Sequence, residues 1–286
     1  LFYNAWDIDF NYRKKPKKVL KEISHICFMD GPKVIRRNIY KYKKTKIVMD
    51  TILTENSNLI EFSLDIEFYE KFKMLRTEFN PNFFSDEVTC EIQFGVIKRS
   101  TLDNDPISKA QFEICAHKFV DVSNENYGLA LLNDSKYGHH VKNGIISLNL
   151  LRSPIYPDKT ADRGRHHIRY ALYPHINNFE NSDVTQTAIL FNNEPILVSK
   201  RLSFESIIKS DTPNIVIDTM KKAENSNGVI VRLYESIGKT CKAKIKTSFK
   251  YNNTYEVDLL ENIIKPIKID ELDFSPFEIK TLLFEL

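Results

Sequence analysis

The chain has 286 residues, of which 42% are hydrophobic and 12% aromatic, so it can bury a large core and is not a disordered polypeptide. Its 41 basic and 38 acidic side chains leave a net charge of +3, too small a bias to indicate a nucleic-acid partner by itself. No apolar run reaches the ~20 residues of a transmembrane helix, which excludes a helical membrane span.

Segments of alternating apolar and polar residues recur along the chain, and this period of two predicts β-strands with one face in water. The alternation is strict in 59–68, 90–97 and 243–249. Further strands are predicted near residues 24–29, 33–42, 45–54, 111–122, 128–132, 145–151, 166–174, 228–235 and 275–284. Many short strands separated by Gly, Asn, Asp and Pro indicate an all-β protein built of sandwiches.

Helix signals are weak, and one polar run divides the strand-rich regions. The segment 211–224, DTPNIVIDTMKKAE, is compatible with one short helix and equally with a strand and a turn. The polar run 177–186 favours a domain boundary. We therefore predict a larger β-domain over residues 1–180 and a smaller β-domain over residues 181–286, without an internal repeat of fixed period.

The cysteines and the start of the chain bear on its cellular context. The four cysteines lie far apart and form no CxxC pair, which argues against a zinc cluster or a dense disulfide framework. A reduced, cytoplasmic protein is the simplest interpretation. The chain starts at Leu1 without a methionine, a basic n-region or a cleavage pattern, so we expect it to be a fragment of a longer polypeptide.

Two basic stretches, RKKPKK at 13–18 and RRNIYKYKKTK at 36–46, combine positive charge with nearby tyrosines, as grooves for single-stranded nucleic acid do. Solvated strand faces explain them better, because acidic residues elsewhere nearly cancel the charge and lysines on a sheet edge discourage edge-to-edge pairing. We therefore expect no nucleic-acid partner and no membrane partner.

Two pairs of adjacent histidines, His139-His140 and His166-His167, are candidate metal ligands. Neighbouring side chains on a strand point to opposite faces, so one pair rarely binds one ion, although one histidine from each pair with added carboxylates would suffice. The sequence has no HExxH or His-x-His spacing. We assign no metal ligand to this chain.

Carboxylates occur in two patterns that suggest catalysis. Glu113, His117 and Asp121 share parity on a predicted strand, but residues four apart on a strand are separated by ~13 Å, beyond hydrogen-bond reach. Asp-Ile-Asp at 7–9 and Asp-Asn-Asp at 103–105 suggest the paired carboxyls of glycosidases, which stand ~5–5.5 Å or ~6.5–9.5 Å apart. The residues alone do not select a pair.

Five segments in chain order match one protein family. They read NAWDIDFNY (4–12), IQFGVIKRST (92–101), a long segment that begins AQFEICAHKFVD and contains YGLALLNDSKYG (110–154), DKTADRGRHHIRYALYPH (158–175) and MKKAENSNGVIVRLYESIGKT (220–240). They resemble the α-mannosidases of glycoside hydrolase family 38, whose microbial and cytosolic branch reads WDAWDID, QFEVCGHKWADLSEPGYGVALLNDCKYG, DPTADMGEHEFTYALYPH and LKKAEDGDGLIVRLYEPHG in similar places.

The resemblance implies an N-terminal α/β-barrel, a small helical bundle and then β-sandwich domains, of which this chain matches only the β-domains. The implied fold is a galactose-mutarotase-like super-sandwich followed by a smaller β-sandwich. The implied reaction is retaining hydrolysis of α-mannosides by an aspartate nucleophile and a second carboxylic acid. That nucleophile and the ligands of a divalent ion, usually zinc, belong to the barrel, so we expect neither a catalytic residue nor a cofactor in this chain.

The same resemblance selects residues that face the sugar. Asn133 and Asp134 lie in the LLND segment, where they either hydrogen-bond to sugar hydroxyls or form the turn that ends at Gly138. Lys136, Tyr137 and Arg152 are further substrate-proximal candidates, and Arg152 is suited to brace Asp134 through a charge-assisted hydrogen bond. The implied partners are α-mannosides and the N-terminal catalytic domain of the same polypeptide.

The chain departs from the family pattern at Phe119, where relatives have tryptophan, at Asn4, and at 165–167, where Arg-His-His replaces Gly-Glu-His. These changes leave the expected fold intact and put substrate preference in doubt. The alternative hypothesis is a free-standing carbohydrate-binding or interaction module without catalysis, since the chain has no catalytic domain of its own.

Overall fold

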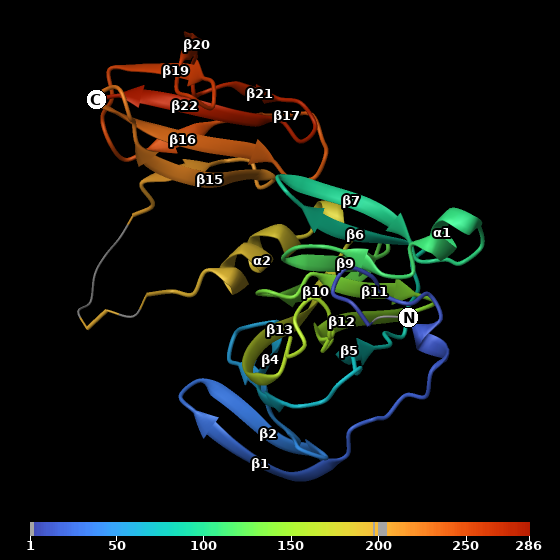
Figure 1. Ribbon diagram of the computed structural model, residues 1–286. Coiled ribbons are helices and arrows are strands. Elements are labelled where there is room, and N and C mark those ends of the chain that lie inside the picture. Colours follow the sequence, from blue (N-terminus) through green and yellow to red (C-terminus); the bar gives the residue numbers. More distant parts are fainter. Residues whose placement is uncertain (1–2, 197, 200–204) are drawn as a thin grey trace. The chain divides into compact units, whose positions relative to one another are not determined.

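The computed structural model describes residues 3–196, 198–199 and 205–286 (Figure 1). The chain divides into two compact units: unit 1 comprises Leu1–Glu91 and Ile97–Glu194, and unit 2 comprises Ile92–Val96 and Pro195–Leu286. These limits separate the two compact units. The domain boundary after residue 180, which the sequence favours, stays a prediction.

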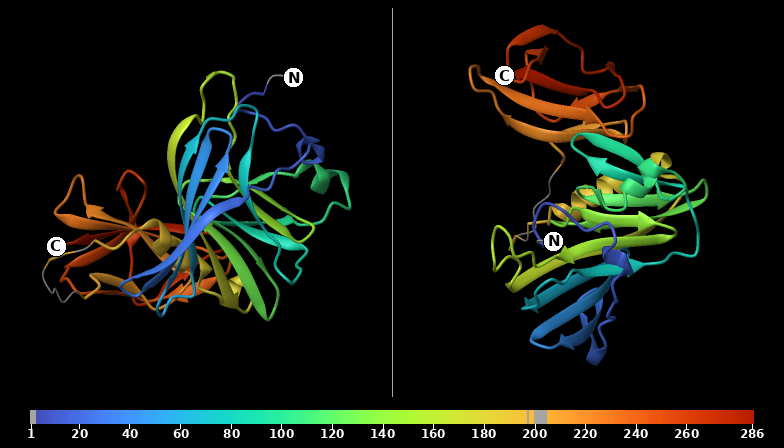
Figure 2. Two further views of the ribbon diagram at one scale, coloured as in Figure 1. Left: turned by 90° about the horizontal axis from the view of Figure 1, so that it is seen from below. Right: turned by 45° about the vertical axis from the view of Figure 1, so that its right-hand side comes forward.

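Unit 1 is built around two sheets. The nine-stranded sheet runs from the β1–β2 hairpin to the β6–β7 hairpin in the order β1-β2-β3-β4-β13-β10-β9-β6-β7 (Figures 1 and 2). Its strands are β1 (Glu22–Asp30), β2 (Lys33–Tyr42), β3 (Thr45–Thr54), β4 (Ile60–Phe68), β6 (Glu87–Ile92), β7 (Gly95–Ser100), β9 (Phe119–Ser123), β10 (Tyr127–Asn133) and β13 (Gly164–Ile176). The four-stranded sheet has the order β5-β12-β11-β8, with β5 (Leu75–Phe79), β8 (Ile114–Cys115), β11 (Gly138–Lys142) and β12 (Ile145–Leu151).

The core of unit 1 lies between these two sheets. The alternating residues of β4 fill it from the large sheet, with Leu64, Ile66 and Phe68 at most 3% exposed. Ile146 and Leu148 of β12 enter the same cluster from the small sheet. Because successive strand residues face opposite sides, this period of two gives β4 an apolar face toward the core and a more polar face away from it. Unit 1 is therefore a β-sandwich.

Unit 2 is a smaller β-structure. Its main sheet has the order β15-β16-β22-β19-β20, with strands β15 (Ile215–Lys222), β16 (Gly228–Glu235), β22 (Ile279–Glu285), β19 (Asn253–Val257) and β20 (Ile263–Pro266). Two short pairs complete it, β14 (Ile208–Ser210) with β18 (Ile245–Thr247) and β17 (Cys241–Ala243) with β21 (Leu272–Phe274). Val231, Leu233, Phe274, Leu282 and Phe284 form its core. The structure confirms the all-β fold class, a large sandwich followed by a smaller one.

Helices are few and short in the described chain. They are the 3-10 helices Tyr12–Lys14 and Phe179–Asn181 and the α-helices α1 (Pro106–Ala110) and α2 (Val184–Asn192). Helix α2 begins within the polar run 177–186, and the sequence analysis missed it. Segment 211–224 contains the strand β15 rather than a helix, because Ile215–Lys222 pairs antiparallel with β16.

Three segments with strand-like alternation are interrupted. Residues 90–97 form a hairpin, since Phe94 turns the backbone with a φ of 55° between β6 and β7. Residues 111–122 are divided between β8 and β9, and residues 243–249 between β17 and β18. Local alternation cannot reveal such breaks when the residues that cause them are distant in sequence.

The basic stretches lie on solvated parts of unit 1, where many of their charges meet carboxylates. Arg13 pairs with Glu78 at 3.0 Å, and Arg37 makes two hydrogen bonds of 2.7 Å to Asp50. Within the residues that the structure places, no helix combines the length and apolar character needed to cross a membrane.

Candidate functional site

The turn that follows β10 crosses from the nine-stranded sheet to the four-stranded sheet, and Asn133 holds it. The Asn133 side chain is fully buried, with its amide nitrogen donating to the His117 carbonyl at 2.7 Å. Its amide oxygen accepts from the Lys136 backbone N–H, also at 2.7 Å. Both the nitrogen and the oxygen of the amide are therefore hydrogen-bonded within the protein. Of the two roles considered for Asn133, the geometry shows the turn-forming one.

The same turn presents four polar side chains outward, from Asp134, Lys136, Tyr137 and the neighbouring His117. Tyr137 is 50% exposed, and its ring lies 5.3 Å from the His117 ring. Asp134 and Lys136 are half-buried, and one carboxylate oxygen of Asp134 accepts from the Ser135 hydroxyl at 3.0 Å. A phenol, an imidazole, an ammonium and a carboxylate thus share one surface, which we call the 134–137 turn surface.

Glu91 holds the chain next to this surface through hydrogen bonds. The sequence analysis did not select this residue. Its side chain is 5% exposed and accepts from the Lys118 backbone N–H at 2.6 Å and from the Lys118 ammonium at 2.7 Å. The Glu91 carbonyl accepts from the His117 N–H at 3.0 Å. These bonds end the strand pattern between β8 and β9 and fix the chain beside the turn.

Arg152 does not brace Asp134, contrary to the expectation from sequence. Its guanidinium donates to the backbone carbonyl of Asp7 and lies over the Tyr3 ring, 5.0 Å from the ring centroid. Its backbone N–H donates to Asp162 at 2.8 Å. The reason is that β12 ends where the N-terminal segment passes, so the nearest acceptor is the carbonyl of that segment. Arg152 therefore fixes residues 3–7.

The three strand residues Glu113, His117 and Asp121 lie in separate environments. Asp121 is buried with His175 at 2.8 Å, the His117 ring meets the Tyr137 ring at a tilt of 57°, and Glu113 belongs to another cluster. As the spacing predicts, they form no triad. Burial opposes protonation of His175, but the hydrogen bond and charge of Asp121 outweigh it and raise the His175 pKa.

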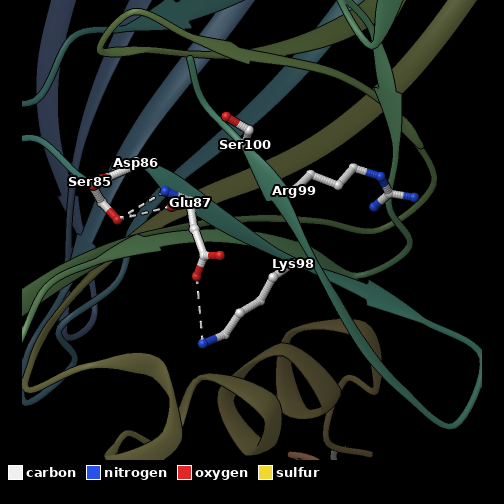
Figure 3. Close-up of a pocket in the computed structure, with 6 residues that line it drawn as sticks. All are labelled: Ser85, Asp86, Glu87, Lys98, Arg99 and Ser100. Carbon is white, nitrogen blue, oxygen red and sulfur yellow. Dashed lines mark hydrogen bonds and ion pairs between the residues drawn. The ribbon is translucent and has the colours of Figure 1, made fainter. Parts of the chain in front are cut away.

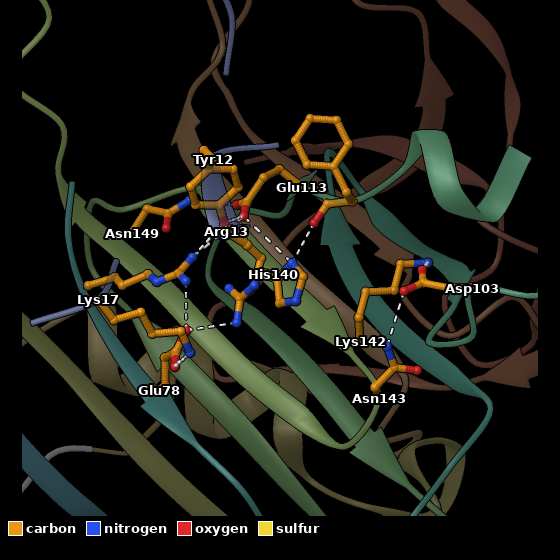
Figure 4. Close-up of polar contacts among 12 residues, drawn as sticks. Tyr12, Arg13, Lys17, Glu78, Asp103, Glu113, His140, Lys142, Asn143 and Asn149 are labelled. Carbon is orange, nitrogen blue, oxygen red and sulfur yellow. Dashed lines mark hydrogen bonds and ion pairs between the residues drawn. The ribbon is translucent and has the colours of Figure 1, made fainter. Parts of the chain in front are cut away.

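A buried polar cluster covers the outer face of the four-stranded sheet, with Tyr12 at its centre (Figure 4). The Tyr12 hydroxyl donates to Glu113, whose second oxygen accepts from the Asn149 amide at 2.7 Å. Arg76 donates to the Tyr12 oxygen and lies over its ring at 5.1 Å. Burial raises the pKa of Glu113, and burial with the nearby Glu113 charge raises the pKa of Tyr12 to about 12. These bonds attach the N-terminal segment to the sheet.

The paired aspartates serve local structure instead of facing one another across a site. Asp9 accepts from the Asn11 N–H at 2.9 Å, and Asp105 caps α1 by accepting from the Ile107 and Ser108 N–H groups. Asp103 lies 3.7 Å from the Lys142 ammonium (Figure 4).

The histidine pairs point in opposite directions, as expected on strands. His139 is fully buried in the core with neither ring nitrogen hydrogen-bonded, whereas His140 bonds to the Phe112 carbonyl at 2.6 Å. His166 bonds to the Asp162 carbonyl, and His167 to Asp65. Among residues 3–196, 198–199 and 205–286, no three His, Cys, Asp or Glu side chains gather as metal ligands would.

Replacing His139 with leucine is expected to stabilise the protein, most strongly in acid. Burial lowers the pKa of His139 to about 3, so the unfolded state takes up a proton first as the pH falls below ~6.5. The histidine therefore costs stability increasingly between pH ~6.5 and about 3. We expect a gain of about 1–2 kcal/mol at pH 7, from removing unpaired buried nitrogens, and about 2 kcal/mol more at pH 5.

Urea unfolding of both proteins at the two pH values measures this. The control is His167→Leu, because the His167 side chain is 56% exposed and its substitution should change little. An H139L protein less stable than the parent at both pH values would contradict the prediction.

A second polar surface lies on the β6–β7 hairpin (Figure 3). A shallow pocket there is lined by Ser85, Asp86, Glu87, Lys98, Arg99 and Ser100. Lys98 lies 3.7 Å from Glu87 and 3.5 Å from Glu180, so acidic neighbours already neutralise its charge. We assign no ligand to it.

Comparison with known families shows which family the chain belongs to. The model of the glycosyl hydrolases family 38 C-terminal domain matches residues 1–160. The chain belongs to glycosyl hydrolase family 38. A second model, the family 38 C-terminal beta sandwich domain, matches residues 214–282.

Proteins named alpha-mannosidases match over nearly the whole chain. Human alpha-mannosidase 2C1 is 32% identical over 100% of this chain, and Dictyostelium discoideum alpha-mannosidase G is 33% identical over 99%. The match covers only 29% and 28% of those two proteins, so this family 38 chain spans less than a third of their length. A family 38 protein of known structure from Enterococcus faecalis superposes with a TM-score of 0.77 over 93% of this chain and 36% of its own, at 15% identity, which shows the shared fold.

Proposed function

We propose that this chain is the C-terminal β-portion of a retaining α-mannosidase and lines one side of a sugar site completed by an N-terminal catalytic domain of the same polypeptide. The observation that carries this is the match of the whole chain to less than a third of proteins named alpha-mannosidases. The nucleophile, the general acid and a divalent ion, usually zinc, are assigned to that other domain. The described residues offer no fitting group of metal ligands.

The 134–137 turn surface supplies what such a role requires of this chain. The Asp134 carboxylate accepts hydrogen bonds from sugar hydroxyls and the Lys136 ammonium donates to them, while the Tyr137 ring packs against the sugar. The buried amide of Asn133 fixes the backbone that carries them. A turn held in this way loses little conformational entropy when the sugar binds. The compartment we propose is the cytoplasm, in keeping with four cysteines that form no disulfide.

The parent open reading frame tests the proposal. The full-length protein, purified with divalent metal, should hydrolyse an aryl α-mannoside with retention of configuration at the anomeric carbon. A full-length protein that binds metal and leaves every α-mannoside intact would refute it. An intact mass of about 33 kDa for the natural protein, the mass of this chain, would favour the free-standing module.

Within the active parent protein, Lys136→Ala is expected to lower kcat/KM for an aryl α-mannoside by about 10- to 100-fold, the usual loss for one charged or hydrogen-bonding contact to the substrate. The matched control is Lys109→Ala, because Lys109 is exposed on α1 and lies outside the turn. The urea midpoint of both variants should equal that of the parent. An unchanged kcat/KM for Lys136→Ala would remove this residue from the sugar site.

A further inference from the structure

Trp6 is the only tryptophan of the chain, and it is 70% exposed. Its ring meets that of Tyr156, which is 54% exposed, with centroids 5.4 Å apart and an interplanar angle of 63°. Two large aromatic rings are thus held together in water, although burying either one would be worth a few kcal/mol. A ligand that covers both rings would remove this apolar surface from water.

The Trp6 ring is mounted on an ordered turn. The Asn4 side-chain oxygen accepts from the Trp6 N–H at 2.9 Å and from the Asp7 N–H at 2.8 Å. An asparagine whose side chain accepts from the N–H groups two and three residues further on mimics a backbone turn and restricts its shape. The position of the indole therefore follows from the local hydrogen bonds of residues 4–7.

The Tyr156 ring is fixed to the same segment by backbone pairing. The Ala5 N–H donates to the Tyr156 carbonyl at 3.0 Å, and the Ile155 N–H donates to the Tyr3 carbonyl at 2.9 Å. Residues 3–5 and 155–156 therefore form a short parallel bridge. Both rings keep their separation without a ligand, so little ordering is required when one binds.

The residue that follows Trp6 in the chain, Asp7, carries a free carboxylate. The Asp7 side chain is exposed, and within the described part of the chain it has no hydrogen bond or ion pair. The Asp7 carbonyl, in contrast, accepts from Arg152, whose guanidinium holds the backbone in place. The turn that carries Trp6 thus also carries, one residue further along the chain, a carboxylate with free lone pairs.

We propose that Trp6, Tyr156 and Asp7 form a binding site for one pyranose ring of the mannoside class. A pyranose has a face of C–H bonds, whose slight positive charge suits the negative face of an aromatic ring, and a rim of hydroxyls that donate to a carboxylate. The size also fits a sugar: two partly exposed rings cover far less than the ~800 Å² per partner of a stable protein interface. The site rests on the proposed function, which supplies the class of sugar.

The single tryptophan makes the test direct, because tryptophan emission from the 286-residue chain comes from Trp6 alone. Titration with methyl α-mannopyranoside is expected to give a saturable change in that emission with a Kd on the order of 1 mM. Tyr156→Ala and Asp7→Asn should each raise the Kd about tenfold or more. Phe84→Ala, which removes a 52% exposed aromatic elsewhere in unit 1, should leave the Kd unchanged.

Two outcomes overturn the site. One is an emission change that glycerol reproduces at equal concentration or that never saturates. The other is an unchanged Kd in both Tyr156→Ala and Asp7→Asn. Far-UV circular dichroism checks that each variant is folded. If Tyr156→Ala does not fold, Asp7→Asn still tests the site, because this change is exposed and nearly isosteric. A silent titration beside an active parent enzyme refutes this site alone, whereas sugar binding beside an inactive parent refutes only the proposed function.

Discussion

Replacing Glu235 with alanine is expected to lower the free energy of unfolding of unit 2 by about 3–5 kcal/mol. The Glu235 side chain is fully buried, and one of its carboxylate oxygens accepts from three backbone N–H groups, those of Gly238 at 2.7 Å, Lys239 at 3.0 Å and Phe277 at 3.0 Å. Its removal leaves several buried donors unpaired. Each such group costs about 1–3 kcal/mol, reduced where water enters the gap.

The second carboxylate oxygen of Glu235 accepts from the Ile237 N–H at 3.0 Å and from the Asn214 amide at 2.8 Å. The carboxylate therefore joins the end of β16 to the loops on either side of it. Urea unfolding followed by circular dichroism measures the loss, with Glu271→Ala as control because the Glu271 side chain is 68% exposed. A loss below about 1 kcal/mol, the usual range of a surface change, would contradict the prediction.

Asn133→Ala is expected to cost about 2–4 kcal/mol in unit 1. The substitution leaves the His117 carbonyl and the Lys136 N–H without their buried partner and opens a small cavity. Asn104→Ala, at an exposed position without a side-chain hydrogen bond, should stay within about 0.5 kcal/mol of the parent. If Asn133→Ala instead kept full stability and lowered only the activity of the parent enzyme, Asn133 would be a sugar contact and not the holder of the turn.

Much of the fold can be predicted from the sequence, because most strands show the alternation of apolar and polar residues within their own length. The alternation in 59–68 predicts β4 and its buried face, since its alternating apolar residues reach the core of the sandwich: Phe62, Leu64, Ile66 and Phe68. The break between β8 and β9 does not follow, because Glu91 causes it from more than 20 residues away. The ambiguity of 211–224 was settled by pairing with β16, which a local pattern cannot show.

The structure has a polar turn where the sequence indicates one, and a sugar site at this turn stays a prediction. The sequence indicates a polar turn at 133–138, yet it cannot show that the Asn133 amide is consumed internally while Asp134 and Lys136 remain accessible. The predicted contact of Arg152 with Asp134 was also wrong, because the sequence does not show which groups meet in the fold. Opposite charges that are near in sequence are not thereby near in space, and the Asp7 carbonyl, 145 residues away, lies closer to the guanidinium.

The 134–137 turn starts in one layer of the sandwich and ends in the other. Its span is therefore set by the distance between the layers, and this distance depends on the volumes of the apolar side chains packed between them. A substitution such as Leu148→Val, which touches no exposed residue, shifts the far anchor of the turn and with it the side chains that the turn carries. Under the function proposed above, substrate preference can therefore drift through changes in the interior of the sandwich, leaving every residue at the surface as it was.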